Sequence, residues 1–391
     1  MDRIRIGLIG GKPGAFIGDA HRMAMLLDGE IELVAACCSS DPERARAAGV
    51  VLGLAPERCY PSYQDLLRAE AALPPEQRIQ AIANVTPNAV HAPVALAALR
   101  AGFHVIADKP LCMDLAEAEA LVTAVRDTGL VFALTHNYSG YPMVKQAREL
   151  VASGALGAIR KVVVEYPQGG LARALPRAVA QGDLAALEAL RVPQKRTARS
   201  ACMADIGTHA AQLAEYVTGL SIDQVCADCD PVVPGRELDA DAHVLLRLNG
   251  GARGILFASQ IAAGEENPLA IRVWGEAGGL RWRQMEPNTL ELRKPGEPIQ
   301  LLRAGGAYNS AAAKAATRMP NGHPEGYIEA FATIYRNAAR CIRAHAAGVA
   351  PDAIAADVPS VADGRHLMAV VEAVADSAAA NSAWTPVPRF D

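Results

Sequence analysis

Short apolar runs alternate with helical patterns over roughly the first third of the chain. The helical patterns place apolar residues on one face, and the last of them is expected to begin at the cap Asp114 and end at Gly129. This alternation predicts βαβ units around a parallel sheet. The expected strands are Ile4–Ile9, Ile31–Cys37, Ile79–Val85, Phe103–Ala107 and Leu130–Thr135, and the expected helices are Ala20–Leu27, Pro42–Ala48, His91–Ala101 and Leu115–Thr128.

Beyond Gly154 the pattern changes to longer and partly alternating apolar runs, which favour a mostly antiparallel sheet with turns such as Asn249–Gly251. Ala-rich helices at Leu184–Ala189 and Tyr327–Ala347 are expected to pack against this sheet, and the tail from Thr385 is expected to be loosely held. The chain is therefore predicted to be an α/β protein with domains at residues 1–137 and 138–391. The expected strands are Ala158–Tyr166, Val225–Val233, Ala240–Leu248, Gly251–Ile261 and Leu269–Gly275.

The composition is that of an ordinary folded protein, with 391 residues, 51% hydrophobic and 20% charged. A net charge of -4 leaves no basic surplus, so we expect neither nucleic acid nor an anionic membrane as a partner. No apolar run approaches the length of a membrane span. The start, Met1-Asp2-Arg3, lacks the features of a secretory signal, and a cytoplasmic location is expected.

The cysteines do not form a disulfide framework or a recognisable metal motif. Cys226-Ala-Asp-Cys229 has CxxC spacing, but no second pair supplies the other ligands of a zinc site. We therefore expect ordinary thiols and no bound metal.

A glycine-rich turn, Gly10–Gly18, joins the first predicted strand to the first helix. Glycines at this place let backbone amides approach a pyrophosphate and direct the positive end of the helix toward it. The loop is about three residues longer than the usual fingerprint and contains Lys12, which would crowd or bind the phosphates. An ordinary tight turn is the alternative. Expected cofactor contacts are Gly10, Gly14, Ala15, Phe16 and Ile17.

The second predicted strand ends without the acidic residue that usually binds the ribose of NAD. Ser39 and Ser40 take its place and Arg44 follows, which leaves room for the 2'-phosphate of NADP. The same serines suit the ribose of NAD, so NAD and NADP both remain open. Asp41 has the simpler interpretation of a cap for the next helix.

Polar residues also follow the third and fifth predicted strands. A nicotinamide ribose can bind at the end of the third strand, next to Thr86, Pro87, Asn88 and His91. The alternative is that these residues simply start a helix capped by Asn88. The stretch from Thr135 to Tyr141 offers hydrogen-bonding and aromatic side chains that suit a sugar or a nicotinamide amide, although tyrosines at a domain junction are often plain packing.

Two further segments offer groups for proton transfer. Lys109, in Asp108-Lys109-Pro110, follows a strand, and the four-residue step from Asp205 to His209 places a carboxylate and an imidazole on one helix face. Each has a common structural explanation: a solvated lysine, a helix cap and a helix histidine. Their joint presence with a nucleotide loop favours acid–base chemistry.

These motifs together resemble the glucose-fructose oxidoreductase, inositol dehydrogenase and rhizopine-catabolism (Gfo/Idh/MocA) family over nearly the whole chain. Asp108-Lys109-Pro110 occupies the place of the family's Glu-Lys-Pro motif, and Asp205-Ile-Gly-Thr-His209 occupies the place of its Asp-x-Gly-x-His motif. The segments His136–Met143 and Gly322–Tyr327 are similar to a less studied branch. The resemblance implies an N-terminal Rossmann dinucleotide-binding domain and a C-terminal α/β domain with an open, mostly antiparallel sheet, in homodimers or homotetramers.

The resemblance also implies hydride transfer between a nicotinamide and a secondary hydroxyl of a sugar, glycoside or cyclitol. Lys109 would hydrogen-bond the reacting oxygen, His209 would be its acid–base partner, and Asp205 would orient the histidine or bind a neighbouring hydroxyl. Asn137 and Asp108 would lie on the cofactor side. The implied substrate contacts are Lys109, Tyr138, Tyr141, Asp205, His209 and His323.

Two segments, 168–171 and 194–199, depart from the family and are expected to line the substrate cleft, so relatives give little guide to the substrate. A nucleotide-binding regulator or scaffold without turnover is the competing hypothesis. A metal-dependent hydrolase that uses His136, His209 and Asp205 is weaker, because no HExxH-like ligand pair is present.

Overall fold

The computed structural model describes residues 3–39, 41–191, 196–233 and 235–390. Internal contacts divide the chain into two compact units. The first unit comprises Met1–Gly140 with Tyr327–Arg365, and the second comprises Tyr141–Gly326 with His366–Asp391. No helix in the described part of the chain is long and apolar enough to cross a membrane.

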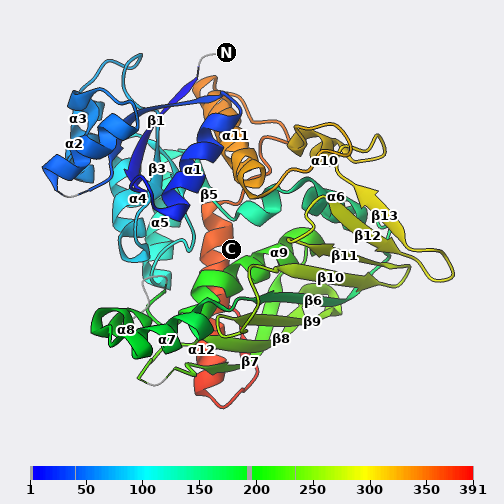
Figure 1. The fold of residues 1–391 in the computed structure, drawn as a ribbon. Coiled ribbons are helices and arrows are strands. Elements are labelled where there is room, and N and C mark those ends of the chain that lie inside the picture. Colours follow the sequence, from blue (N-terminus) through cyan, green and yellow to red (C-terminus); the bar gives the residue numbers. More distant parts are fainter. Residues whose placement is uncertain (1–2, 40, 192–195, 234, 391) are drawn as a thin grey trace. The chain divides into compact units, whose positions relative to one another are not determined.

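The first unit is built on a parallel sheet of five strands in the order β2-β1-β3-β4-β5 (Figure 1). Strand β1 lies between β2 and β3, so the chain changes direction across the sheet at this point, where open α/β sheets bind ligands beyond the carboxyl ends of the strands. The strands are β1 (Ile4–Gly10), β2 (Ile31–Cys37), β3 (Ala81–Val85), β4 (His104–Ala107) and β5 (Phe132–Leu134).

Helices lie on both faces of this sheet (Figure 1). The predicted parallel sheet is confirmed, and β2 and α5 have the predicted bounds. Helix α5 is capped by Asp114 and ends before Gly129, which has a left-handed conformation. Helix α3 was not predicted. The helices of the first unit are α1 (Phe16–Leu27), α2 (Pro42–Val51), α3 (Tyr63–Ala71), α4 (His91–Arg100), α5 (Leu115–Thr128) and α11 (Tyr327–Ala346), with short turns η1 (Pro56–Arg58), η2 (Asn88–Val90) and η3 (Asn137–Gly140).

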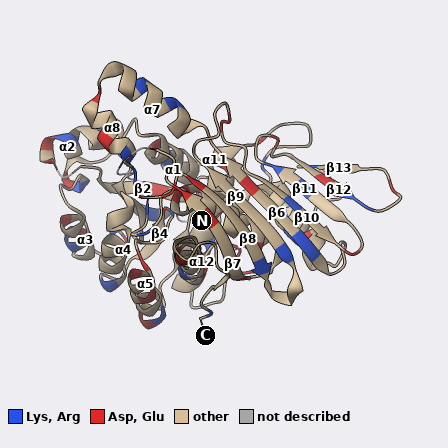
Figure 2. Cartoon of the chain, turned by 90° about the horizontal axis from the view of Figure 1, so that it is seen from below, with Lys and Arg blue, Asp and Glu red and all other residues tan. Residues whose placement is uncertain are grey.

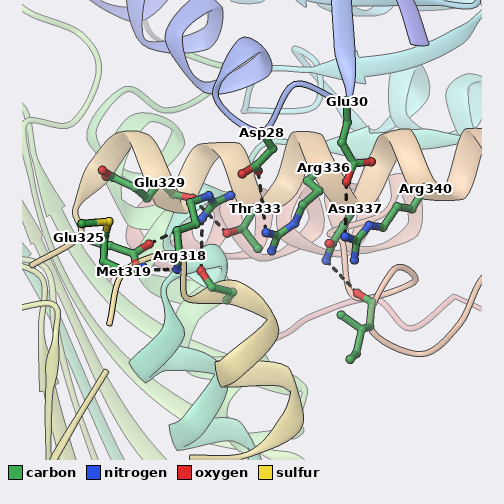
Figure 3. A network of polar contacts seen from close by, with 12 residues as sticks. Asp28, Glu30, Arg318, Met319, Glu325, Glu329, Thr333, Arg336, Asn337 and Arg340 are labelled. Atoms are coloured by element: carbon green, nitrogen blue, oxygen red, sulfur yellow. Dashed lines mark hydrogen bonds and ion pairs between the residues drawn. The ribbon is translucent and has the colours of Figure 1, made fainter. Parts of the chain in front are cut away.

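Helix α11 was predicted to pack against the antiparallel sheet, and this prediction is wrong. Its apolar face, with Phe331 and Tyr335, packs with Met25 of α1 and with the strands of the parallel sheet in one buried cluster. Each such buried side chain contributes about 2 kcal/mol. On its polar side, Arg336 approaches Asp28 at 3.9 Å and Arg340 approaches Glu30 at 3.4 Å, which ties α11 to the turn after α1 (Figure 3).

The second unit is built on a nine-stranded sheet in the order β13-β12-β11-β10-β6-β9-β8-β7-β14. Within the described part of this sheet only β6 and β9 pair in parallel, so the predicted mostly antiparallel sheet is confirmed. The strands are β6 (Ile159–Pro167), β7 (Ile222–Asp230), β8 (Asp241–Leu248), β9 (Arg253–Ser259), β10 (Ala270–Gly275), β11 (Gly279–Arg283), β12 (Thr289–Arg293), β13 (Gln300–Arg303) and β14 (Thr385–Pro386).

Helices α6 and α9 pack against this sheet. The tail is not loosely held as predicted, because β14 pairs with β7 and Val387 N–H donates to the carbonyl of Asp223 at 2.8 Å. The helices of the second unit are α6 (Pro142–Ala152), α7 (Gly170–Gln181), α8 (Leu184–Arg191), α9 (Thr208–Thr218), α10 (Ala311–Ala316) and α12 (Val361–Ala379), the last beginning in the first unit, with η4 (Met203–Gly207) and η5 (Asn249–Gly251).

Charged residues of both signs are distributed over helices and strands (Figure 2). All eight cysteines are free thiols, with Cys226 and Cys229 on β7. Among the described residues, no group of three His, Cys, Asp or Glu side chains is arranged to hold a metal ion.

Candidate functional site

The glycine loop between β1 and α1 forms a close-fitting cradle. Gly10 has φ 81°, and a Cβ there would lie 2.3 Å from the carbonyl oxygen of Val85. A Cβ on Gly18 would lie 2.6 Å from the backbone of Gly11, so α1 also packs tightly on the loop. The N-cap of α1, Ala15, makes no side-chain capping bond, which leaves the first amides of the helix available for an anion.

Two side chains of α1 that the sequence did not point to hold this loop. Arg22 donates to the carbonyl of Gly11 at 3.0 Å, and Asp19 accepts from the amide of Gly14 at 3.2 Å and pairs with Arg22. They are recognisable only as charged residues on the first turns of the helix. The loop is therefore fixed by side chains of α1, and Lys12 is exposed.

The aromatic ring at the start of α1 is prominently exposed. Phe16 is 74% exposed and stacks on Tyr327 of α11 at 6.0 Å between ring centroids. Ile17, the next residue, is half-buried. Large exposed apolar side chains beside a polar loop are typical of binding surfaces.

The end of β2 presents thiols and hydroxyls. Cys37 ends the strand and Cys38 follows it, and burial raises the pKa of Cys37 to about 11. Ser39 Oγ accepts from the amide of Asp41, whose carboxylate in turn caps α2 by accepting from Arg44 N–H at 2.9 Å. The capping interpretation of Asp41 is thus confirmed, and the Arg44 side chain is exposed. Ser40 lies outside the described residues.

The end of β3 is clamped by His91. Its Nε2 lies 2.8 Å from the carbonyl of Thr86 and its Nδ1 lies 2.7 Å from the carbonyl of Pro110, so one imidazole joins the ends of β3 and β4. Pro87 and Asn88 form the short turn η2 between them. Asn88 does not cap α4, because the N-cap is Val90 without a side-chain bond.

Asp108 lies directly after β4 as a half-buried carboxylate with donors close to one of its oxygens. Its Oδ1 accepts from the Lys109 amide at 2.9 Å and the Thr135 hydroxyl at 3.1 Å, and His21 Nε2 is 3.6 Å away. Desolvation alone would raise the pKa of Asp108, but the nearby imidazole of His21 holds it well below its usual range. His21, which sequence reasoning missed, is itself held by Tyr335 Oη at 2.6 Å. The Lys109–Pro110 peptide is cis.

The end of β5 contributes a fully buried amide. Neither end of the Asn137 carboxamide has a hydrogen-bond partner among the described residues, which is unusual for a buried polar group. Beside it, burial first and the Lys109 charge second lower the pKa of His136 to about 3. A nicotinamide carboxamide has the donor and acceptor that Asn137 lacks, so this residue and the glycine cradle fit a dinucleotide.

The predicted tyrosines are buried and lie near other aromatic rings. Tyr138 lies 6.3 Å from the ring of Tyr327 in the first unit, and Tyr141 lies 5.3 Å from Trp282 in the second. His323 is exposed, with Nδ1 3.2 Å from the carbonyl of Pro320.

Glu325 holds together the segment around His323. Its Oε1 accepts from the amides of Arg318 and Met319 at 2.6 and 2.8 Å (Figure 3). This glutamate is part of the segment Gly322–Tyr327, but nothing in the sequence indicated its role.

Asp205 and His209 lie in a helix that begins with a π-helical turn. Residues Met203–Gly207 form η4 and continue into α9, so the helix starts earlier than predicted and Asp205 lies inside it rather than at its cap. Single π-turns are frequent at functional sites. Both side chains are 6% exposed, and the ring of His209 lies 6.3 Å from that of Tyr166.

The N-cap function at this helix comes from Asp239, far along the chain. Its two oxygens accept from the amides of Ala201 and Met203 at 2.7 and 2.8 Å. Asp205 is thereby left for other contacts, and its Oδ2 accepts from Gln260 Nε2 at 3.1 Å. Neither Asp239 nor Gln260 stands in a motif that the sequence singled out.

The two segments that depart from the family lie in the second unit. Gln168 Nε2 and Tyr166 Oη both donate to Asn267 Oδ1 at 2.7 Å, and a Cβ on Gly169 would lie 2.6 Å from the carbonyl of Ala262. Of the segment 194–199, residues 194 and 195 lie outside the described residues.

The structure thus brings the ends of β1, β3, β4 and β5 to one edge of the parallel sheet, with Thr86, Lys109 and Asn137 among them. Lys109 belongs to the first unit, whereas Asp205 and His209 belong to the second. The glycine cradle, the open helix N-terminus and the strand order define the first unit as a dinucleotide-binding Rossmann domain.

Comparison with known proteins places the chain in a family. Residues 4–136 match the model of the oxidoreductase family with an NAD-binding Rossmann fold, and residues 144–281 match the GFO/IDH/MocA C-terminal domain. The protein named uncharacterized oxidoreductase YfiI of Bacillus subtilis (strain 168) is 32% identical over 85% of this chain and 84% of its own length. The chain belongs to the Gfo/Idh/MocA family and is an NAD(P)-dependent oxidoreductase.

Two relatives have named ligands or substrates. The crystal structure of an inositol dehydrogenase homolog from Azotobacter vinelandii, complexed with NADH and myo-inositol, is 34% identical with a TM-score of 0.88, covering 98% of both chains. Levoglucosan dehydrogenase of Pseudarthrobacter phenanthrenivorans is 25% identical over the whole of both chains.

Proposed function

We propose that the protein transfers a hydride between NAD or NADP and a secondary hydroxyl of a sugar, glycoside or cyclitol, or the corresponding ketone. The observation that carries this proposal is the position of Lys109 at the carboxyl edge of the Rossmann sheet, after the strand that neighbours the one leading to Asn137, whose buried amide fits a nicotinamide. The named ligand or substrate of the two relatives, myo-inositol and levoglucosan, supports the substrate class.

The residues of the chain would handle the proton. When bound, the nicotinamide supplies the carbon that accepts or gives the hydride. Loss of hydride from a carbinol carbon requires that the hydroxyl proton leave as well, so a base within hydrogen-bond reach of the oxygen is needed. We propose Lys109 and His209 for this work. Lys109 would hydrogen-bond the reacting oxygen, and His209 would take the proton or return it in the reverse direction.

The remaining site residues would bind and orient. Asp205 would orient His209 or bind a neighbouring hydroxyl. The phosphates would be held by Gly10, Gly14, Ala15, Phe16 and Ile17. The adenosine ribose would be held by Ser39, Ser40 and Arg44. The nicotinamide end of the cofactor would be held by Thr86, Pro87, Asn88, His91, Asp108 and Asn137. On the substrate side, Tyr138, Tyr141 and His323 are proposed contacts.

We also propose that the chain forms homodimers or homotetramers through the nine-stranded sheet. On β8 the residues that alternate with buried Val244 and Leu246 stay exposed, Leu245 by 48%, and on β10 Trp274 is 37% exposed. Glu165 and Arg272 pair nearby at 3.7 Å, and charged residues of both signs lie on strands of this sheet (Figure 2). The sheet therefore offers charges as well as apolar side chains. Such a mixed surface suits a self-complementary contact about a two-fold axis.

The test is a panel of sugars, glycosides and inositols, each assayed with NAD and with NADP by the absorbance of the reduced nicotinamide. We expect turnover of at least one member. Lys109→Ala and His209→Ala should each lose catalysis while nucleotide binding survives. Turnover near the wild-type rate in either variant contradicts the residue roles, and failure of the whole panel together with absence of nucleotide binding contradicts the function.

A further inference from the structure

A line of polar contacts in the second unit reaches Asp205 from a buried cation. Arg236 is 7% exposed, and its Nη2 donates to Gln260 Oε1 at 3.3 Å, while Gln260 Nε2 donates to Asp205 Oδ2 at 3.1 Å. The order is therefore guanidinium, amide, carboxylate. The three residues come from the loop before β8, the end of β9 and η4.

The polarity of the middle amide is fixed by its neighbours. Arginine is only a donor and an ionised carboxylate is only an acceptor. The amide oxygen of Gln260 must therefore face Arg236, and its NH2 group must face Asp205. A reversed amide would set two donors against each other at one end and two acceptors at the other.

Gln260 and Arg236 are both firmly held. Gln260 donates its backbone amide to Ala240 and accepts from Leu171 N–H at 2.8 and 3.0 Å. Arg236 also donates to the carbonyls of Leu190, Leu238 and Asp239, so its guanidinium is fixed by four acceptors in all. A preorganised donor of this kind holds a carboxylate in one orientation.

We propose that Gln260, oriented by Arg236, is a positioning residue that fixes the orientation of the Asp205 carboxylate and keeps it ionised for sugar oxidation. This inference rests on the proposed function, because it assumes that Asp205 acts at His209 or at a substrate hydroxyl. Gln260 acts through Asp205 and is given no contact with substrate or cofactor. Cys202, whose pKa is raised by burial first and then by charges that include Asp239 and Asp205, lies near this carboxylate, and His209 follows on the same helical segment.

Two substitutions of Gln260 separate this role from simple packing. Gln260→Met keeps the volume and removes the donor to Asp205. Gln260→Glu places a second carboxylate within hydrogen-bond distance of the first, and two such groups share one proton, which raises the pKa of the pair. Arg236 stabilises the new glutamate as an anion, so the proton would reside on Asp205.

A matched control lies on another part of the sheet. Gln224 Oε1 accepts from Arg247 Nη1 at 2.8 Å, so it is also a glutamine paired with an arginine. Gln224→Glu makes the same chemical change on β7, away from the Asp205 contact. It should leave both the activity and its pH dependence unchanged.

The experiment measures kcat/KM from pH 5 to 10 for myo-inositol, D-glucose and levoglucosan, together with the Kd of NADH. Gln260→Met should lower kcat/KM about tenfold or more with NADH binding unchanged. Gln260→Glu should move the acid limb of the pH profile up by about one unit, since Asp205 then ionises only at higher pH. Wild-type kcat/KM and pH profile in both Gln260 variants would overturn the proposal.

Urea denaturation gives a readout that needs no turnover. A carboxyl pKa that is raised in the folded state contributes stability at low pH that is lost as pH rises through it. Gln260→Glu should therefore lose stability relative to Gln224→Glu as pH rises from about 5 to 8. If the wild type oxidises none of the three compounds, the proposed substrate class fails by itself. Parallel denaturation profiles of the two glutamate variants would then overturn the Gln260 proposal as well, and diverging profiles would support it.

Discussion

Replacing Gly10 by alanine tests the nucleotide cradle most sharply. Gly10 has φ 81°, and an added Cβ would lie 2.3 Å from the carbonyl oxygen and 2.6 Å from the carbonyl carbon of Val85. These are backbone atoms of the neighbouring strand, so they cannot turn away as a side chain would. Gly29, in the turn between α1 and β2, offers a matched control, because it has φ 67° and an added Cβ would meet no atom within 4 Å.

The expected losses follow from these two geometries. Alanine in the left-handed region costs about 1–2 kcal/mol, and this is the whole expected effect of Gly29→Ala. Gly10→Ala adds an overpacking cost of about 1–3 kcal/mol, so its unfolding free energy should fall by about 2–5 kcal/mol. Relief of the clash must also displace β1 from β3, where the phosphate loop begins. NADH affinity should therefore fall by about tenfold or more in Gly10→Ala alone.

The assay combines urea denaturation with NADH binding followed by nucleotide fluorescence. Gly29→Ala should lose stability and keep the NADH Kd of the wild type. A Gly10→Ala protein that is as stable as Gly29→Ala and binds NADH like the wild type would refute the assignment of this loop as the cofactor cradle.

Three further predictions concern stability and assembly. Burial, with His345 as the second cause, lowers the pKa of His104 to about 4, so the unfolded chain binds a proton that the folded chain rejects as pH falls below about 6.5. The unfolding free energy should then drop by up to about 3 kcal/mol between pH 7 and 4, and His104→Gln should flatten this slope in urea titrations; an equal slope contradicts the pKa direction. Asp239→Ala should lower the unfolding free energy by about 1–2 kcal/mol because Ala201 and Met203 lose their acceptor, and unchanged denaturation would argue against the cap. If the proposed oligomer forms through the nine-stranded sheet, Leu245→Asp should convert it to monomers in light scattering, whereas an intact oligomer would place the interface elsewhere.

The fold was predictable where local signals agreed. Strand β2 is apolar except for the exposed Glu32, and α5 has a side-chain cap at Asp114 and a glycine at its end, so their bounds follow from neighbouring residues alone. Helix α11 has an equally clear apolar face, but periodicity does not say which sheet that face meets. The packing of this face against Met25 and the parallel sheet arises only from the tertiary structure.

The same limit applies to the candidate site. Glycines, Lys109, Asp205 and His209 stand in short motifs, and the structure places each of them on the expected kind of element. Their supports come from distant parts of the chain: His21 approaches Asp108, Asp239 caps the helix of Asp205, and Gln260 donates to Asp205 itself. No spacing rule links such residues, because tertiary packing brings them together.

The most direct test of the proposed reaction follows the hydrogen itself. The enzyme is incubated with NAD or NADP and with the most active polyol of the panel, deuterated at its carbinol carbons, and the reduced nicotinamide is examined by mass spectrometry. Direct hydride transfer predicts reduced cofactor that carries one deuterium, with the signal lost in Lys109→Ala and His209→Ala. Reduced cofactor without deuterium, or undiminished transfer in both variants, would contradict the account.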